Sequence, residues 1–317
     1  MTTLRVIFMG TPQFAVPSLE TLAKSNLDVT LVVTAPDAPA GRGRKIQSSA
    51  VKNKAEELGL SIFQPEHANS EEAFQIISAS NPNLIAVVAF GQRLHENLLE
   101  LPQLGCINVH PSLLPKFRGA APIQHAIMND ENLTGVSTIF MNEKMDSGDI
   151  LLQREIPIEH NDTGGTLSHK LSEIGAELLI MTLNSVSQCR NRRVPQVEAE
   201  STLAPALYNT HAKITWSEPA IRIHNLVRAL NPRPGAQTLF GENLIKIWST
   251  HIPDENSPNT TSPGTIVRSN HSELWVATGK KYIAIDELQS QGRKKLPVKE
   301  WLRGTKLKIG QTLTSNN

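Results

Sequence analysis

Three polar residues near the middle of the chain have the types and spacing that acyl-transfer chemistry needs. Asn108 and His110 stand two residues apart at the end of an apolar segment, so a strand there would point both side chains the same way. An amide donor beside an imidazole can stabilise a developing oxyanion and move a proton. Asp146 follows in a Met-Asp-Ser-Gly-Asp turn, where a carboxylate could hold one tautomer of the imidazole and favour its charged form. By spacing alone such residues are more often surface or capping groups, so their grouping is a hypothesis about the fold.

The elements that must position these residues alternate between strand and helix in the N-terminal part of the chain. Short apolar runs predict buried strands, and the helical segments begin at a capping hydroxyl or end at a glycine. Strands are predicted over 4–9, 28–34, 83–89 and 106–110, and helices from Thr11, over 49–58 and over 165–186. This alternation indicates an α/β domain with a doubly wound, mostly parallel, Rossmann-like sheet.

The composition changes after residue 189, which predicts a second domain. Residues 190–208 are polar, contain prolines and keep no period, so they are expected to form a linker between a domain over 1–189 and one over 209–317. The C-terminal part has one helical stretch and then short strands separated by Gly, Pro, Asn and Ser. The helix is predicted over 220–230 and the strands over 236–240, 243–248, 265–268, 274–277 and 282–286. This pattern favours a small all-β barrel or sandwich.

Several classes of protein are disfavoured by the same residues. The turn Gly10-Thr-Pro-Gln-Phe-Ala is not G-x-G-x-x-G, the glycine pattern that lets the backbone approach a dinucleotide. Cys106 and Cys189 stand alone, which argues against a disulfide framework and a structural zinc site, and no metal is expected. The start MTTLRVIFMG does not resemble a secretory signal, and no apolar run approaches a membrane span. A soluble, reduced protein of the cytoplasm is expected.

The net charge of +1 hides an uneven distribution along the 317 residues. Residues 206–317 carry 15 Lys and Arg against 8 Asp and Glu, whereas the rest of the chain is net acidic. An asymmetry of this kind indicates either an anionic partner or a solubilising surface.

Long motifs around the candidate site carry a family resemblance. The segment SLLPKFRGAAPIQ, with Asn108 and His110 before it and MDSGDIL after it, closely resembles the folate-dependent formyltransferases. Similar motifs extend from VIFMGTPQFAVPSLETL and APDAPAGRGRKIQ to ITWSEPA and VRALNPRPGA, so the resemblance spans nearly the whole chain. Within the family, the chain is most similar to the branch that formylates the methionine carried by initiator tRNA.

The resemblance implies a reaction and roles for the three polar residues. A formyl group would pass from 10-formyltetrahydrofolate to the α-amino group of methionyl initiator tRNA, without a metal, at the start of translation. Asn108 and His110 match the positions that stabilise the oxyanion, and Asp146 matches the carboxylate that orients the histidine and helps the proton to leave the amine. A monomer is expected.

The resemblance also implies where folate binds. The predicted contacts follow the strand over 83–89 or continue from His110; they are Phe90, Gly91, Leu94, Ser112, Leu113, Leu114 and Pro115. Members of the family usually have tyrosine and proline where this chain has Phe90 and His95, so one hydroxyl and one fixed φ are absent. We expect folate to bind, with the geometry of this loop as the main departure. Arg93 and His95 are interpreted as a solvated helix start.

The tRNA contacts implied by the resemblance lie in both domains. Phe14 matches a residue that contacts the methionyl side chain, although ordinary core packing explains it almost as well. Lysines and arginines that would meet tRNA phosphates occur in the AGRGRK loop and in an OB-like C-terminal barrel: Arg42, Arg44, Lys45, Lys280, Lys281, Arg293, Lys294 and Lys295. By spacing alone the AGRGRK segment is a surface loop, and any one of the C-terminal lysines is more often a plain solvated charge.

Other functions remain open from sequence. Enzymes that formylate glycinamide ribonucleotide share the Asn, His and Asp positions, and enzymes that formylate amino-sugar nucleotides are a second alternative. Neither gives a reason for a basic appended barrel. A non-catalytic RNA-binding protein on a decayed enzyme scaffold is a third possibility, against which the joint presence of Asn108, His110 and Asp146 argues.

Overall fold

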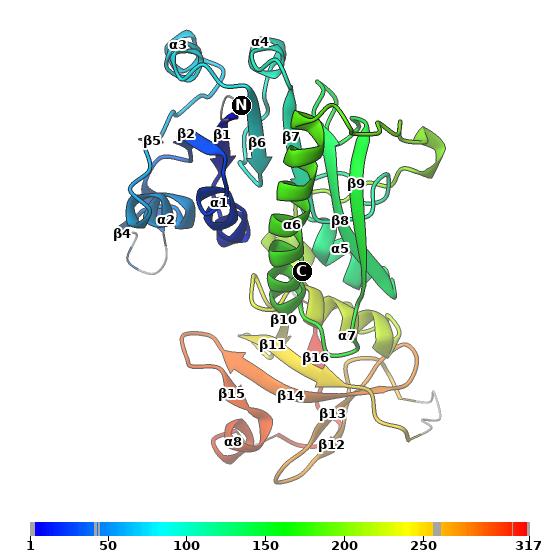
Figure 1. Cartoon of the computed structure of the whole chain (residues 1–317). Coiled ribbons are helices and arrows are strands. Elements are labelled where there is room, and N and C mark those ends of the chain that lie inside the picture. Colours follow the sequence, from blue (N-terminus) through cyan, green and yellow to red (C-terminus); the bar gives the residue numbers. More distant parts are fainter. Residues whose placement is uncertain (1–3, 41–42, 44, 256–260, 306, 316–317) are drawn as a thin grey trace. The chain divides into compact units, whose positions relative to one another are not determined.

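The chain forms two compact units, each with its own sheet (Figure 1). The structure is a computed structural model that describes residues 4–40, 43, 45–255, 261–305 and 307–315. Unit 1 comprises Met1–Pro122, Leu133–Pro157 and Ser168–Pro205, and unit 2 comprises Ile123–Asn132, Ile158–Leu167 and Ala206–Asn317. Two short segments, residues 123–132 and 158–167, therefore group with the C-terminal part although they precede residue 205. The linear division at residues 190–208 stays a prediction.

The sheet of unit 1 has the strand order β5-β2-β1-β6-β7-β8-β9. Its parallel strands are β1 (Arg5–Gly10), β2 (Asp28–Val33), β5 (Ile62–Phe63), β6 (Leu84–Val88) and β7 (Cys106–His110). The last two strands, β8 (Leu133–Phe140) and β9 (Ile150–Pro157), form an antiparallel hairpin at the edge beside β7. The predicted mostly parallel α/β sheet is confirmed. The hairpin is the part that strand-helix alternation does not predict.

Two helices of unit 1 begin at a capping serine. Ser49 precedes α2 (Ala50–Glu57) and accepts a hydrogen bond from the Lys52 N–H at 2.9 Å, and Ser70 caps α3 (Glu71–Ala79) in the same way. The expected helix start at Thr11 is wrong. Its hydroxyl instead donates to the Phe90 carbonyl at 2.8 Å, and α1 (Val16–Ala23) begins only after the short helix η1 (Gln13–Ala15).

The long helix α6 (Gly164–Ser187) packs its middle part on the sheet (Figure 1). A methyl group at Gly175 would lie 3.0 Å from the Val109 side chain, so glycine permits this close approach to β7. The hydroxyls of Thr138 on β8 and Thr182 on α6 hydrogen-bond at 2.8 Å within the buried interface. Helix α6 therefore holds β7 and β8, the strands next to the candidate site.

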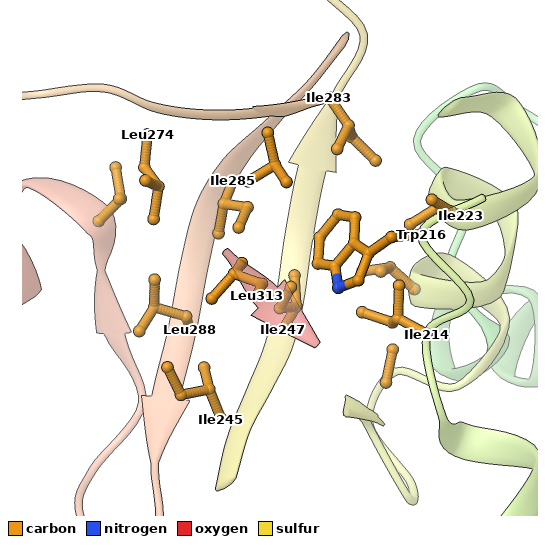
Figure 2. Close-up of a cluster of buried hydrophobic side chains, with 14 of the residues drawn as sticks. Ile214, Trp216, Ile223, Ile245, Ile247, Leu274, Ile283, Ile285, Leu288 and Leu313 are labelled. Atoms are coloured by element: carbon orange, nitrogen blue, oxygen red, sulfur yellow. The ribbon is translucent and has the colours of Figure 1, made fainter. Parts of the chain in front are cut away.

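Unit 2 is built on an antiparallel half-barrel sheet with the order β12-β13-β14-β11-β10-β16. Its strands are β10 (Ala236–Phe240), β11 (Asn243–His251), β12 (Ile266–Ser269), β13 (Leu274–Ala277), β14 (Tyr282–Ser290), β15 (Leu296–Pro297) and β16 (Leu313–Thr314). The core between this sheet and α7 (Ala220–Ala229) consists largely of aliphatic side chains around Trp216 (Figure 2). The Trp216 indole donates to the Thr238 hydroxyl at 3.0 Å, which satisfies its one polar atom.

The two early segments of unit 2 are bound to α7 by polar contacts. The Asn225 amide donates to the Asp130 carboxylate at 2.8 Å, and Arg228 donates to the Asp162 carbonyl at 3.0 Å. A methyl group at Gly164 would lie 2.4 Å from the Ala229 carbonyl oxygen, so backbone meets backbone there. Residues 123–132, with most of α5 (Pro122–Met128), and residues 158–167 are thus integral to unit 2.

Both cysteines of the chain are free. Burial raises the pKa of the Cys106 thiol to about 12, and Cys189 is exposed. Among the described residues, no three His, Cys, Asp or Glu side chains meet in an arrangement that could hold a metal ion. No helix in the described part of the chain is long and apolar enough to cross a membrane.

His224 makes the stability of unit 2 depend on pH. Its ring on α7 is 5% exposed and accepts from or donates to the Thr250 hydroxyl at 2.9 Å. Burial, and then the positive charge of Arg228 with His160 and His251 nearby, lowers the pKa of His224 to about 4. An unfolded histidine binds its proton near pH 6.5, so the unfolded state gains protons first as the pH falls from about 6.5 to 4. The stability that neutral His224 contributes is therefore present above pH 6.5 and is lost over that interval.

We expect the free energy of unfolding of unit 2 to drop between pH 7 and pH 5 by about 2 kcal/mol more in the native chain than in a His224→Gln variant. Glutamine keeps a polar partner for Thr250 but does not titrate in this range. Urea unfolding followed by tryptophan fluorescence measures the difference, because the 4 tryptophans all lie in residues 206–317. Equal pH dependence in the two proteins would contradict the assignment.

Candidate active site

Strand β7 places two of the predicted residues at its carboxyl end. Asn108 pairs with Val87 on β6 and with Ile139 on β8, so its backbone is fixed from both sides. The side chain of His110 is 4% exposed. Because side chains two residues apart on a strand share a face, both point to the same side of the sheet, as the spacing predicts.

Asp146 reaches these residues from the turn between β8 and β9. One carboxylate oxygen accepts from the Asn108 amide at 3.4 Å, and the other lies 3.6 Å from Nδ1 of His110. That second oxygen also accepts from the backbone N–H of Gly119 at 2.8 Å. The structure therefore brings the three predicted residues together, from a strand, its end and a distant turn.

The ring of His110 lies between two oxygen acceptors. Its Nε2 is 2.9 Å from the carbonyl oxygen of Phe117, and its Nδ1 faces the Asp146 carboxylate. A carbonyl oxygen only accepts, so Nε2 carries a hydrogen in this geometry. Phe117 is itself held, since its N–H donates to the Thr202 hydroxyl at 2.8 Å. The histidine is consequently fixed in orientation on both sides.

A cavity of about 300 Å³ opens beside these side chains. Its walls come from the segment after β6 and from the turn between β8 and β9, with Asn108, Asp146 and Gly119 also in the lining. The apolar part of the wall is formed by Val87, Ala89, Phe90, Leu94, Ala120, Ile139, Met141 and Met145. Such a mainly apolar recess with a few convergent polar groups is typical of a site for a small organic ligand.

The predicted folate contacts fall into two groups. Phe90, Gly91 and Leu94 line the cavity. The run from Ser112 to Pro115 is not part of the lining; its members are Ser112, Leu113, Leu114 and Pro115. These residues pack on β8 instead: the Leu114 N–H donates to the Ser137 hydroxyl at 3.0 Å, and that hydroxyl donates to the Ser112 carbonyl at 2.7 Å. They support the strand that carries the turn and do not face the cavity.

The loop that departs from the usual family pattern is held by other side chains. Phe90 is 3% exposed and packs in the core next to β6. Its ring lacks the tyrosine hydroxyl, so it has no polar group that would need a hydrogen-bond partner there. The His95 N–H donates to the Asn69 side chain at 2.8 Å just before α4 (Glu96–Glu100). The Gln92 side chain accepts from the Ala68 N–H at 2.8 Å. These bonds replace the constraint that a proline would supply.

Arg93 takes part in the cavity, although the sequence suggested a solvated helix start. Its guanidinium donates to the Glu143 carbonyl and so connects the two loops that form the walls. Arg93 and Glu143 both line the cavity.

The residues predicted to contact tRNA belong to several elements of the two units. Half-buried Phe14 lies in η1 and is not among the cavity-lining residues, Lys45 is exposed at the start of β4 (Lys45–Gln47), and Arg42 and Arg44 lie outside the described residues. The C-terminal basic residues occupy two turns at opposite ends of β14: Lys280 and Lys281 precede it, and Arg293, Lys294 and Lys295 follow it. A strand of 9 residues separates the two turns by roughly 25–30 Å. Lys295 also pairs with Glu287 at 2.5 Å.

Backbone and side-chain groups that orient Asp146 were missed from sequence. Gly119 supplies its N–H, and its φ of 124° lies in the region that favours glycine. Gln196 donates to the carbonyls of Asp146 and Gly148, both at 2.8 Å. The glycine of the FRG motif was a usable signal for the first, whereas Gln196 stands in a segment without period or motif.

Comparison with known proteins shows the family of the chain. The chain matches the family model for formyl transferase over residues 4–183 and the model for the formyl transferase C-terminal domain over residues 207–306. It is 42% identical over 310 residues to the methionyl-tRNA formyltransferase of Pelotomaculum thermopropionicum, covering 98% of both chains. It is 41% identical to the methionyl-tRNA formyltransferase of Clostridioides difficile, covering 98% of this chain and 100% of that one.

A solved structure gives the same result for the fold. The N-formyltransferase from Helicobacter canadensis, in complex with folinic acid and dTDP-3-aminofucose, superposes with a TM-score of 0.67 at 18% identity. The match covers 93% of this chain and 100% of that chain. With matches to both family models and relatives of more than 40% identity along its whole length, the chain belongs to the formyl transferase family, in the group of the methionyl-tRNA formyltransferases.

Proposed function

We propose that this chain transfers the formyl group of 10-formyltetrahydrofolate to the α-amino group of the methionine carried by initiator tRNA, as a cytoplasmic monomer acting before translation initiation. The single observation that carries the proposal is the likeness to methionyl-tRNA formyltransferases over 98% of the chain. The grouping of an amide, an imidazole and a carboxylate at one cavity supports it. Neither glycinamide ribonucleotide nor an amino-sugar nucleotide is favoured as the acceptor.

The cavity fits the ring system of a folate. Its volume is at the small end for ligand sites, which suits the flat head of the molecule and leaves the tail outside. Apolar side chains such as Leu94, Ile139 and Met141 offer flat contact, and Gly91 adds no side chain to the wall. Asn108 and Asp146 supply polar groups in the same lining, where the formyl group would have to lie.

The chemistry then follows from where charge develops. The amine nitrogen attacks the formyl carbon, and the carbonyl oxygen becomes an oxyanion as the carbon turns tetrahedral. We assign Asn108, which lines the cavity, as one donor to that oxyanion, and His110 as the second donor once its ring turns from the Phe117 carbonyl toward the cavity. Asp146, held by Gly119, keeps the imidazole oriented and accepts the proton that the attacking amine loses. The oxyanion then re-forms the carbonyl, the carbon–nitrogen bond to the folate breaks, and Asp146 returns the proton to the leaving nitrogen.

The acceptor is tested by supplying the chain with 10-formyltetrahydrofolate and one of three amines: charged initiator tRNA, glycinamide ribonucleotide or an amino-sugar nucleotide. Transfer of the formyl group to the methionyl-tRNA alone is the expected result. Transfer to either small amine at a comparable kcat/KM would overturn the proposed substrate.

Replacing His110 tests the assigned chemistry. We expect His110→Ala to lower kcat by about 100-fold to 10,000-fold, because it removes a donor and the partner of Asp146. The effect on binding of tetrahydrofolate should be smaller, since His110 is not part of the cavity lining. Formylation kinetics and equilibrium folate binding measure the two effects. His169→Ala, at a side chain on α6 that is 76% exposed, is the matched control and should keep the native kcat. Near-native turnover of His110→Ala would reject the assigned role.

Salt dependence tests the assignment of tRNA to basic residues of unit 2. Truncation at residue 206 would strip 123–132 and 158–167 of their partners, so single sites are the better probe. For Lys280→Ala combined with Lys281→Ala, we expect a weaker dependence of log KM for tRNA on log salt. The slope should fall by about 0.7–0.9 for every tRNA phosphate that the variant no longer neutralises, because fewer counterions are released.

Lys24→Ala, at an exposed residue of unit 1, is the control with the same chemical change and should leave that slope unaltered. If the paired variant also has the native slope, these two lysines do not contact tRNA phosphates.

A further inference from the structure

The segment over 194–204 lies along the candidate site in unit 1, although its composition predicts a linker. Val194 and Ile150 exchange two backbone hydrogen bonds at 2.8 and 2.9 Å, where β9 begins. Further along, the Arg118 N–H donates to the Thr202 carbonyl at 2.8 Å, and the Ala204 N–H donates to the Arg118 carbonyl at 2.7 Å. We call residues 194–204 the strap. It joins the turn that carries Asp146 to the loop that contacts His110.

Gln196 is the strap residue whose side chain is fully engaged. Its amide nitrogen donates to the carbonyls of Asp146 and Gly148, both at 2.8 Å, and its amide oxygen accepts from Nε of Arg118 at 3.0 Å. Two donors and one acceptor are thus used in directions that only an amide can satisfy. A glutamate carboxylate in this place would face the same two carbonyl oxygens, and it has no hydrogen to donate to them.

Arg118 connects this amide to the rest of the site. The residue is 6% exposed, and its guanidinium also pairs with Glu198 at 2.9 Å. Its chain neighbours are the residues that engage the candidate catalytic groups, Phe117 at the His110 ring and Gly119 at the Asp146 carboxylate. The Arg118 guanidinium therefore connects the loop at His110 to the strap, and Gln196 connects the strap to the turn that carries Asp146.

The turn needs such a restraint because of its backbone. Asp146 has a φ of 51°, a left-handed conformation that costs a non-glycine residue on the order of 1 kcal/mol. Gly148 lies so close to Phe140 that a methyl group there would stand 1.7 Å from its carbonyl oxygen. Gln196 bonds the carbonyls at both of these positions. The bonds hold the turn where the carboxylate meets Asn108, His110 and Gly119.

We infer that Gln196 is a positioning residue for the formyl transfer: its amide, aligned by Arg118, holds the backbone of the 146–148 turn so that the Asp146 carboxylate is aimed at His110. The inference rests on the proposed function, because it requires Asp146 to take part in the reaction. Gln196 itself touches no substrate in this assignment, and it is not part of the cavity lining.

The test compares Gln196→Glu, Asp146→Asn and the double variant in the formylation of charged initiator tRNA. Gln196→Glu keeps the size of the side chain and an acceptor for Arg118 but removes both donors. We expect its kcat to fall about 10-fold to 100-fold, as for a displaced catalytic group, with KM for tRNA within about 2-fold of native. In the Asp146→Asn background, Gln196→Glu should lower kcat by less than about 3-fold, because the carboxylate that Gln196 positions is already absent.

Two further measurements separate a positioning role from loss of structure. Thermal unfolding and equilibrium binding of tetrahydrofolate should stay close to native in Gln196→Glu, and Glu200→Gln, at an exposed residue of the strap, should have native kcat. If Gln196→Glu proves unstable, Gln196→Met provides a second variant of similar length without the charge, and it should give the same non-additive cycle.

The outcomes distinguish the inference from the function beneath it. Native kcat in Asp146→Asn would overturn the assigned role of Asp146 and the inference with it. If Asp146→Asn loses most of its kcat, two results would overturn only the positioning role of Gln196. One is a native kcat in Gln196→Glu. The other is a double variant in which the two losses of kcat multiply.

Discussion

The carboxylate of Asp146 is the group on which the geometry of the site depends. It is 14% exposed, and a carboxylate taken so far out of water must be met by donors. The donors are the Asn108 amide and the Gly119 N–H, and the His110 ring faces the same carboxylate at 3.6 Å; the three come from β7, its end and the loop that follows. No single element offers all three. The sheet, the turn between β8 and β9 and the loop after β7 must therefore meet at one point for the charge to be tolerated.

The antiparallel β8–β9 hairpin supplies the turn that meets this requirement. Because β8 runs against β7, His110 pairs with Ser137, and the last residue of β8, Phe140, pairs with Ile107 near the start of β7. The turn that follows β8 carries Asp146 to Asn108. Ser137 also bonds the Ser112 and Leu114 backbone, so the run from Ser112 to Pro115 fixes the hairpin to the chain that leaves β7.

Much of the fold could be predicted from sequence because periodicity, caps and short apolar runs act locally. The strands around Val6, Val29, Leu84 and Val109, and the helix over 164–187, are of this kind. Asn108 and His110 could be placed together for the same reason, since their spacing fixes their direction on a strand. The role of Gln196 could not be predicted, because its partners are the carbonyls of residues about 50 positions away and a carbonyl leaves no trace in a sequence. Thr11 has the sequence context of a helix cap but does not act as one for a similar reason, since its acceptor is the backbone of Phe90.

The grouping of residues into unit 2 has a consequence for how such a protein can change over generations. The chain passes between the two units at five points, and two of these flank the β8–β9 hairpin that carries Asp146. Recombination at one junction near residue 205 would join a new C-terminal part to segments 123–132 and 158–167 that fit the old one. The C-terminal part can therefore be inherited or exchanged as a working module only when those two segments, which are encoded upstream of the junction, change with it.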